Sequence, residues 1–140
     1  MALNNSQEWR VESRGTRVES MKIKRFEDII AWQKAREQVE KIYRLTGTDK
    51  FNRDFGLKDQ IRRAAISVMS NIAEGYARQT DKEFVQILYI ARGSAFEIQS
   101  QLYVALDLGY IVEEEFEKTY EAFSEISRLI MGLIKYLQNK

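Results

Sequence analysis

The residue types that most often carry out chemistry in proteins are missing from this chain. It contains no histidine and no cysteine, which removes the commonest general base at neutral pH, the thiol nucleophile and the usual zinc ligands. Ser67, Ser70 and Ser94 therefore have no histidine partner for a catalytic triad. The Glu-x-x-His motifs of a di-iron bundle and the glycine-rich phosphate loops are also absent. We expect a protein that is not an enzyme and holds no metal and no cofactor.

A set of basic residues could instead contact phosphates as positioning charges. Its members stand before the first predicted helix, at the start of the second and at its end: Lys22, Lys24, Arg25, Lys58, Arg62, Arg63 and Arg78. The 22 basic and 21 acidic residues give a formal net charge of +1, so the chain is not uniformly basic, but a local patch is compatible with that balance. The set predicts a nucleic-acid-binding surface, and the alternative is an ordinary solvated surface.

Polar residues also line the second and third predicted helices beside their apolar stripes. They are Arg63, Ser67, Ser70, Asn71, Glu74 and Arg78 on one helix, and Arg92, Ser94, Glu97 and Gln101 on the other. We interpret most of this polar seam as hydrogen bonds and salt bridges between helices, which fix the register of packing.

Apolar residues recur three and four apart in four segments, as in helices that bury one face. The segments begin near Phe26, Leu57, Phe84 and Phe116, and they end near Thr46, Tyr76, Ala105 and Leu137. Thr80 with Glu83 is a capping-box signature that opens the third helix, and turn residues between 47 and 56 predict a loop. Four helices joined by short connections alternate in direction, so the sequence predicts an all-α, up-and-down antiparallel four-helix bundle.

The chain of 140 residues has the length of one domain. Residues 22–140 are expected to form the bundle domain, and residues 1–21 a flexible N-terminal arm that is disordered or docks loosely as a helix. No apolar run approaches the roughly 18 residues that cross a bilayer, and no signal peptide is evident. We therefore expect a cytoplasmic protein with no membrane partner.

Further apolar residues widen the stripe of some helices beyond one core-facing row. They are Val85, Tyr89, Phe96 and Tyr103 on the third helix, Leu129, Ile134 and Tyr136 on the fourth, and Trp32 on the first. Either they form the edges of a broad core, or they form a subunit interface, because large exposed apolar patches usually mark one.

From about Ile23 onward the chain resembles the four-helix-bundle proteins encoded by intervening sequences in bacterial 23S ribosomal RNA genes. The resemblance is carried by residues 26–28, 32–35 and 42–43, by Gly56-Leu57, Gln60-Ile61-Arg62-Arg63-Ala64-Ala65 and Ser70-Asn71-Ile72-Ala73-Glu74-Gly75, and by Glu83-Phe84, Ile90-Ala91-Arg92-Gly93-Ser94, Glu97, Gln101-Leu102 and Leu108-Gly109-Tyr110. It implies a homopentamer with a central channel or basic face. The family is also similar to the accessory variability determinant of diversity-generating retroelements, which binds nucleic acid and a reverse transcriptase.

The residues and the resemblance together lead to one functional hypothesis and one alternative. The hypothesis is a non-enzymatic, homo-oligomeric accessory protein that binds RNA or DNA through the seven basic residues. The alternative is a protein–protein scaffold, or an adaptor for a reverse transcriptase in a diversity-generating retroelement. The partners expected are thus further copies of the chain, a nucleic acid and a reverse transcriptase.

Overall fold

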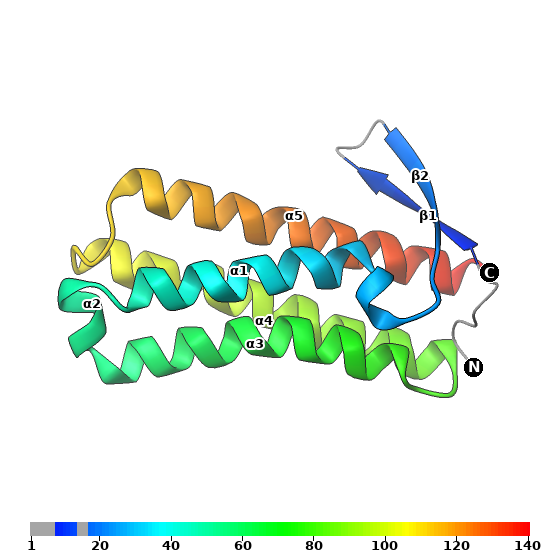
Figure 1. The fold of residues 1–140 in the computed structure, drawn as a ribbon, viewed down its shortest axis with the longest axis horizontal. Helices are drawn as coiled ribbons and strands as arrows, with labels where there is room; N and C mark the ends of the chain where they lie inside the picture. Colours follow the sequence, from blue (N-terminus) through cyan, green and yellow to red (C-terminus); the bar gives the residue numbers. More distant parts are fainter. Residues whose placement is uncertain (1–7, 14–16) are drawn as a thin grey trace.

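Four long helices make up most of the computed structural model, which describes residues 8–13 and 17–140, with side chains from residue 23 onward. They are α1 (Ile30–Thr46), α3 (Phe55–Tyr76), α4 (Asp81–Asp107) and α5 (Glu113–Gln138). The four helices run antiparallel to their sequence neighbours (Figure 1). The predicted all-α, single-domain fold with four antiparallel helices is thus confirmed.

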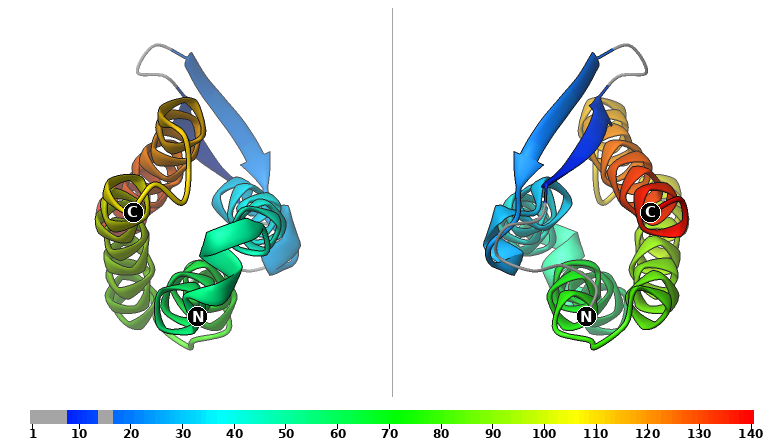
Figure 2. Two further views of the ribbon diagram at one scale, coloured as in Figure 1. Left: turned by 90° about the vertical axis from the view of Figure 1, so that its left-hand side faces the viewer. Right: turned by 90° about the vertical axis from the view of Figure 1, so that its right-hand side faces the viewer.

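Seen along their length, the helices form a ring in the order α1, α3, α4 and α5 (Figure 2). Each packs against the next, and α1 and α5 close the ring. The centre is filled by side chains that are fully buried, among them Ile42, Ile61, Leu88, Phe123 and Ile130. Burial of this apolar surface, at about 25 cal/mol per Å², is the main stabilisation of the bundle.

Local signals set the ends of the helices. The Thr80 hydroxyl accepts a hydrogen bond from the Glu83 N–H (3.1 Å) at the start of α4, as the capping-box signature predicts. Gly109 follows α4 with a φ of 72°, a conformation that glycine adopts at little cost. The Tyr110 N–H then donates to the Ala105 carbonyl and the Gly109 N–H to the Leu106 carbonyl, a Schellman motif that satisfies two free carbonyls.

The loop predicted between residues 47 and 56 contains a short helix, α2 (Asp49–Arg53). Its one buried residue is Phe51, which is fully buried and packs against Tyr110 with ring centroids 5.3 Å apart. Asp54 then caps α3, because its carboxylate accepts a hydrogen bond from the Leu57 N–H (3.1 Å). The expectation of a plain loop was wrong, since burial of Phe51 organises the segment.

The N-terminal segment contains a hairpin where the sequence predicts a flexible arm or a docked helix. Strands β1 (Glu8–Ser13) and β2 (Arg17–Lys22) pair antiparallel, with Trp9 opposite Met21. Strand β1 lies against α5, and the hairpin occupies the side of the ring between α1 and α5 (Figure 2). Residues 1–7 and 14–16 lie outside the described part, and the division into an arm and a domain stays a prediction.

The core explanation for the widened apolar stripes holds for some of these residues and not for others. Trp32, Leu129 and Ile134 are buried within the chain itself, so they are edges of a broad core. Tyr89, Phe96 and Tyr103 on α4 are exposed by 43%, 49% and 51%. Within residues 8–13 and 17–140, no helix has both the length and the apolar character that crossing a bilayer requires.

Candidate nucleic-acid interface

The seven basic residues singled out from the sequence do not form one patch. Lys58, Arg62 and Arg63 lie on the first turns of α3, whereas Arg78 lies just beyond its last turn. Twenty residues of helix separate Lys58 from Arg78, which corresponds to about 30 Å at 1.5 Å per residue. Lys24 and Arg25 precede a 3-10 turn, η1 (Phe26–Asp28), that packs near α3.

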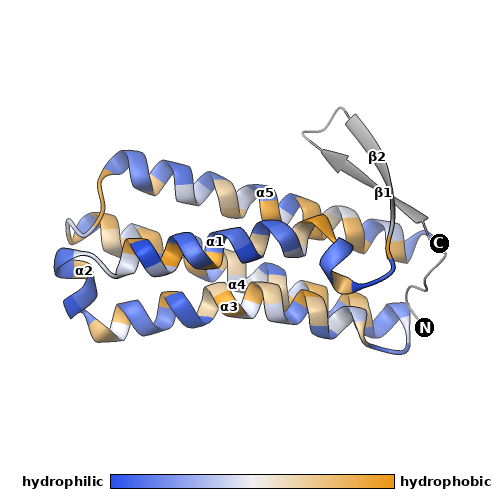
Figure 3. Ribbon diagram, in the orientation of Figure 1, coloured by the Kyte–Doolittle hydropathy of each residue, from blue (hydrophilic) through white to orange (hydrophobic). Residues whose placement is uncertain are grey.

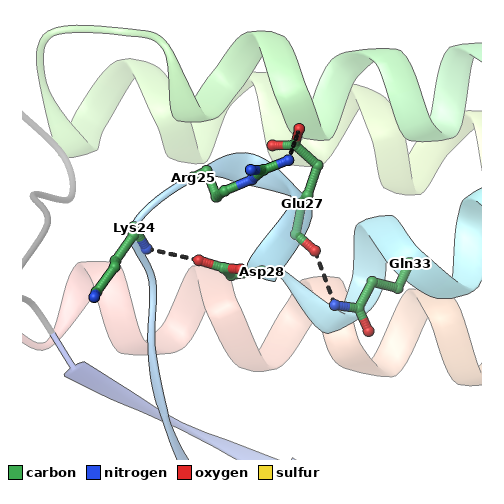
Figure 4. A network of polar contacts seen from close by, with 5 residues as sticks. All are labelled: Lys24, Arg25, Glu27, Asp28 and Gln33. Carbon is green, nitrogen blue, oxygen red and sulfur yellow. Dashed lines mark hydrogen bonds and ion pairs between the residues drawn. The ribbon is translucent and has the colours of Figure 1, made fainter.

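Around η1 the Arg25 side chain and the Lys24 backbone are held by local acidic partners (Figure 4). The Arg25 guanidinium lies 2.6 Å from the Glu27 carboxylate, and this hydrogen bond lowers the pKa of Glu27 and raises the pKa of Arg25. The Lys24 backbone N–H donates to Asp28 (2.9 Å). Arg78 pairs with Glu74 one turn earlier (2.8 Å). Lys22 ends β2, and its side chain lies outside the described part.

Arg62 has a structural role at the C-terminal end of α1, where it forms two hydrogen bonds. Its Nε donates to the Thr46 hydroxyl (2.8 Å) and its Nη2 to the Tyr43 carbonyl (3.2 Å). Thr46 is fully buried and donates in turn to the Ile42 carbonyl (2.7 Å). Arg62 therefore satisfies carbonyl and hydroxyl groups at the C-terminus of α1, where a cation also complements the helix dipole.

The opposite end of the bundle carries a larger group of cations than the sequence analysis proposed. We call the basic residues of this end the basic sector, comprising Arg44, Lys50, Arg53, Lys58, Arg62 and Arg63. With Lys41, which precedes them on α1, residues 41–63 contain seven basic and three acidic residues, a net charge of +4. Lys50 and Arg53 were missed because their segment was interpreted as a loop. They lie on α2, which packs against α3.

Two exposed aromatic rings lie among these cations. Phe55 is 68% exposed, and the Lys58 ammonium is 4.9 Å from its ring centroid. Tyr43 is 40% exposed, and the Arg62 guanidinium is 4.3 Å from its ring centroid. Exposed rings held among cations can stack on bases while the cations contact phosphates.

The same end of the molecule also carries an acidic segment on the other side. Residues 107–117 include Asp107, Glu113, Glu114, Glu115 and Glu117, and no basic residue. Both α2 and the opening turns of α5 are hydrophilic and stand at this end (Figure 3). The Tyr110 hydroxyl joins the two sides by donating to the Asp54 carboxylate (2.9 Å). The end of the bundle is thus divided into a basic and an acidic half.

The polar seam between α3 and α4 is largely a packing feature, as its interpretation predicts. Ser67 and Ser94 share a hydrogen bond across the two helices (3.0 Å). Asn71 donates to the Ser67 hydroxyl (2.9 Å) and carbonyl (2.8 Å). Beside these serines lies a surface cleft of about 360 Å³ whose charged lining is Asp59, Arg63 and Glu97. In the described part of the chain, no cluster of acidic side chains is suited to hold a metal ion.

The fold and this surface define an all-α helical-bundle domain with charged ends. The family model of the 23S rRNA-intervening sequence protein matches residues 27–132, and the chain belongs to that family. This confirms the resemblance inferred from the sequence.

A solved structure supports the same assignment. It is a protein of unknown function from the S23 ribosomal protein family of Bacteroides thetaiotaomicron VPI-5482, with a TM-score of 0.69 and 26% sequence identity. The match covers 76% of this chain and 99% of that one. Among curated proteins, no sequence matches.

Proposed function

We propose that this chain is a non-enzymatic, homo-oligomeric accessory protein that binds RNA through its basic sector. The observation that carries the proposal is the placement of two exposed rings, Phe55 and Tyr43, among six cations at one end of the bundle. Cations supply affinity for any phosphate backbone. Aromatic faces add stacking, which requires unpaired bases, so the surface suits loops and single-stranded segments of a structured RNA better than duplex DNA.

Assembly would strengthen an interaction that one chain makes only weakly. A single basic sector can bind a few phosphates, whereas a homopentamer, the assembly suggested by the family resemblance, would present five copies of it. Linked sites convert later binding steps into intramolecular ones and raise the overall affinity. The cytoplasm, where structured RNA is found, is the compartment that this proposal assigns.

A salt titration of binding to a structured RNA and to duplex DNA tests the proposal. The charge reversals Lys50→Glu and Arg53→Glu together should weaken RNA binding at least tenfold. They should also flatten the plot of log affinity against log salt by about 0.7 to 0.9 for each phosphate that the variant no longer neutralises. Phe55→Ala should lower affinity with little change in slope, because stacking contributes about 1–3 kcal/mol per base.

The matched control is the pair Lys118→Glu and Lys135→Glu, which makes the same change in net charge on the exposed face of α5. It should change affinity and slope much less than the Lys50 and Arg53 pair. Equal effects of both pairs would mean that only the net charge matters, and would overturn the assignment of the basic sector. If the unaltered chain binds neither the structured RNA nor the duplex DNA measurably, the proposed function itself is overturned.

A second candidate is an adaptor for a reverse transcriptase. It is favoured by Leu108 and Val112, which are exposed next to three consecutive glutamates, Glu113 to Glu115. Two exposed apolar residues beside a run of glutamates are complementary in charge to a basic protein surface with an apolar centre. Binding to purified reverse transcriptase that is abolished in Val112→Ser and retained in Lys50→Glu would select the adaptor over the RNA-binding protein.

A further inference from the structure

Helix α4 has an unusually apolar outer surface. Its inner face supplies the core with residues such as Leu88, Ala95 and Leu102, all fully buried. Yet from Ile87 to Leu106 the only charged residues are Arg92 and Glu97. A helix with one solvated face normally carries polar residues there, and a helix that is apolar all round is normally buried. The outer side of α4 therefore has the composition of a covered surface.

The exposed residues of α4 repeat every seven positions. Tyr89, Phe96 and Tyr103 form one row, and Gln86, Gly93 and Ser100 precede each of them by three residues. These rows correspond to the d and a positions of a heptad repeat, the pattern of a helix that packs along another helix. Apart from its chain neighbours and the backbone of its own helix, no described atom lies within 4 Å of the point that a Gly93 Cβ would occupy, so no other part of the described chain covers the seam at this position.

The two charges indicate which helix could pack there. In this heptad register Arg92 flanks the seam at position g and Glu97 at position e. In a parallel pair of helices, a g residue faces the e residue five positions later on the partner, and such pairs set partner choice and orientation. Arg92 and Glu97 are five residues apart and opposite in charge, so a second copy of α4 is complementary to the first. In an antiparallel pair each flank faces the same flank, and these two charges do not meet.

Both charged groups are available for such an interaction. Within the described part of the chain, neither has an ion-pair partner. The Arg92 guanidinium lies 4.9 Å from the Phe96 ring centroid, and its buried Nε makes no hydrogen bond there. The exposed Glu97 carboxylate accepts one hydrogen bond, from Gln101 (3.3 Å).

We propose that the outer seam of α4 is the surface through which copies of this chain associate, with their α4 helices parallel and Arg92 of one copy paired with Glu97 of the next. Each copy offers one residue of the pair on each flank, so the same pairing can close between two copies or repeat around a closed ring. The proposal rests on the homo-oligomeric part of the proposed function, and it identifies the interface that this part requires.

A charge-swap series measured by light scattering tests the pairing. The single variants Arg92→Glu and Glu97→Arg should each lower the mass towards one chain, 16.5 kDa, at concentrations where the unaltered protein is assembled. The double variant carrying both changes restores opposite charges and should restore the mass. The control swaps Arg128 and Glu121, an exposed ion pair on α5 (2.9 Å), and should leave the mass unchanged.

Cross-linking tests the orientation, and it is straightforward because the chain has no cysteine. Gly93→Cys and Ser100→Cys lie on the seam two turns apart. In a parallel assembly each faces the same residue of its neighbour, so a short bis-maleimide should link both variants to themselves. Glu121→Cys on α5 should remain unlinked. An antiparallel pair can bring at most one of the two seam positions close to its own copy.

The outcomes separate this interface from the wider function. If the unaltered protein is a single chain in solution, both the interface and the homo-oligomeric function fail. If it is assembled but neither charge reversal changes its mass, or the double variant does not recover it, the Arg92–Glu97 pairing is overturned while homo-oligomerisation stands. If either seam cysteine stays unlinked in an assembled protein, the parallel arrangement is overturned, even where a charge variant fails to fold.

Discussion

Gly75 allows α3 and α4 to approach closely at one end of the bundle. A Cβ at this position would lie 2.8 Å from Cδ1 of the Phe84 ring, which is fully buried. Because a packed ring has little room to move, we expect Gly75→Ala to lower the free energy of unfolding by about 1–3 kcal/mol. This loss should outweigh the gain of about 0.5–1 kcal/mol that alanine brings to a helix interior.

Gly132 in α5 is the matched control for this prediction. Apart from its chain neighbours and the backbone of its own helix, no described atom lies within 4 Å of its Cβ position, so Gly132→Ala should raise the free energy of unfolding by about 0.5–1 kcal/mol. Urea denaturation of both variants measures the two values. A Gly75→Ala protein as stable as the unaltered one would show that Phe84 can shift, and that the close approach of α3 and α4 is not required.

Arg62 and Arg63 are adjacent in the sequence but should respond differently to substitution. Arg62 makes two hydrogen bonds at the end of α1, and hydrogen bonds of charged groups contribute about 1.5–3 kcal/mol. Arg62→Gln should therefore lower the free energy of unfolding by about 1–3 kcal/mol. Arg63 is exposed, and Arg63→Gln should stay within about 0.5 kcal/mol of the unaltered protein.

RNA-binding and urea-denaturation measurements on the same two variants distinguish the roles. We expect Arg63→Gln to weaken RNA binding without a decrease in stability. If Arg62→Gln proves as stable as Arg63→Gln, the Thr46 and Tyr43 hydrogen bonds do not stabilise α1, and Arg62 returns to the set of simple phosphate ligands.

At the scale of elements, one hydrogen bond joins the loop before α3 to the loop before α5. The Asp54 carboxylate accepts it from the Tyr110 hydroxyl, and this bond, with partial burial, raises the pKa of Tyr110. A folded-state pKa above the unfolded value of about 10 means that the protonated phenol stabilises the fold at lower pH. That contribution is complete below the unfolded pKa and is lost as pH rises through the folded pKa.

Tyr110→Phe removes this hydrogen bond, so its effect on stability should depend on pH. The unaltered protein should be the more stable of the two at neutral pH, and the difference should shrink once the pH exceeds about 10. Urea denaturation of both proteins at several alkaline pH values measures it. A constant difference across that range would mean that the Tyr110 hydroxyl titrates in the folded state as it does in the unfolded chain.

The helices that the sequence predicts well are those whose signals are local. Three- and four-residue spacing located α1, α3, α4 and α5, and Thr80 marked the start of α4. Helix α2 was missed because its five residues are held by the burial of Phe51 in the core, a tertiary effect that turn-forming neighbours conceal. The hairpin did leave a signal, since apolar and polar residues alternate from Trp9 to Glu12 and from Arg17 to Glu19.

The candidate interface was only partly predictable, because spacing along the chain does not give spacing across the fold. Lys58, Arg62 and Arg63 lie near one another on α3, but Arg78 lies at the far end of that helix. The sequence also does not tell which cations already have partners. Arg25 and Glu27 are two residues apart, a spacing that indicated no pair, because the bond depends on the 3-10 turn that contains Glu27 and follows Arg25.

At the scale of the whole molecule, the segment that follows the hairpin belongs to the core. Ile23 and Ile29 are fully buried, and they are the first fully buried side chains among those described, which begin at residue 23. A variant lacking residues 1–21 should therefore keep its helices and unfold cooperatively. We expect its stability to fall by only about 1–2 kcal/mol, in the range of an ordinary destabilising change, because among the long helices β1 contacts mainly α5.

A longer deletion provides the contrast. A variant lacking residues 1–29 also lacks Ile23 and Ile29, and burial of an isoleucine contributes about 1.5–3 kcal/mol. It should be several kcal/mol less stable than the shorter deletion and unfold at clearly lower temperature, as followed by circular dichroism. Similar behaviour of the two variants would place the edge of the core later in the chain. Unfolding of the shorter variant would mean that the hairpin belongs to the folding unit, and that the domain does not begin near residue 22.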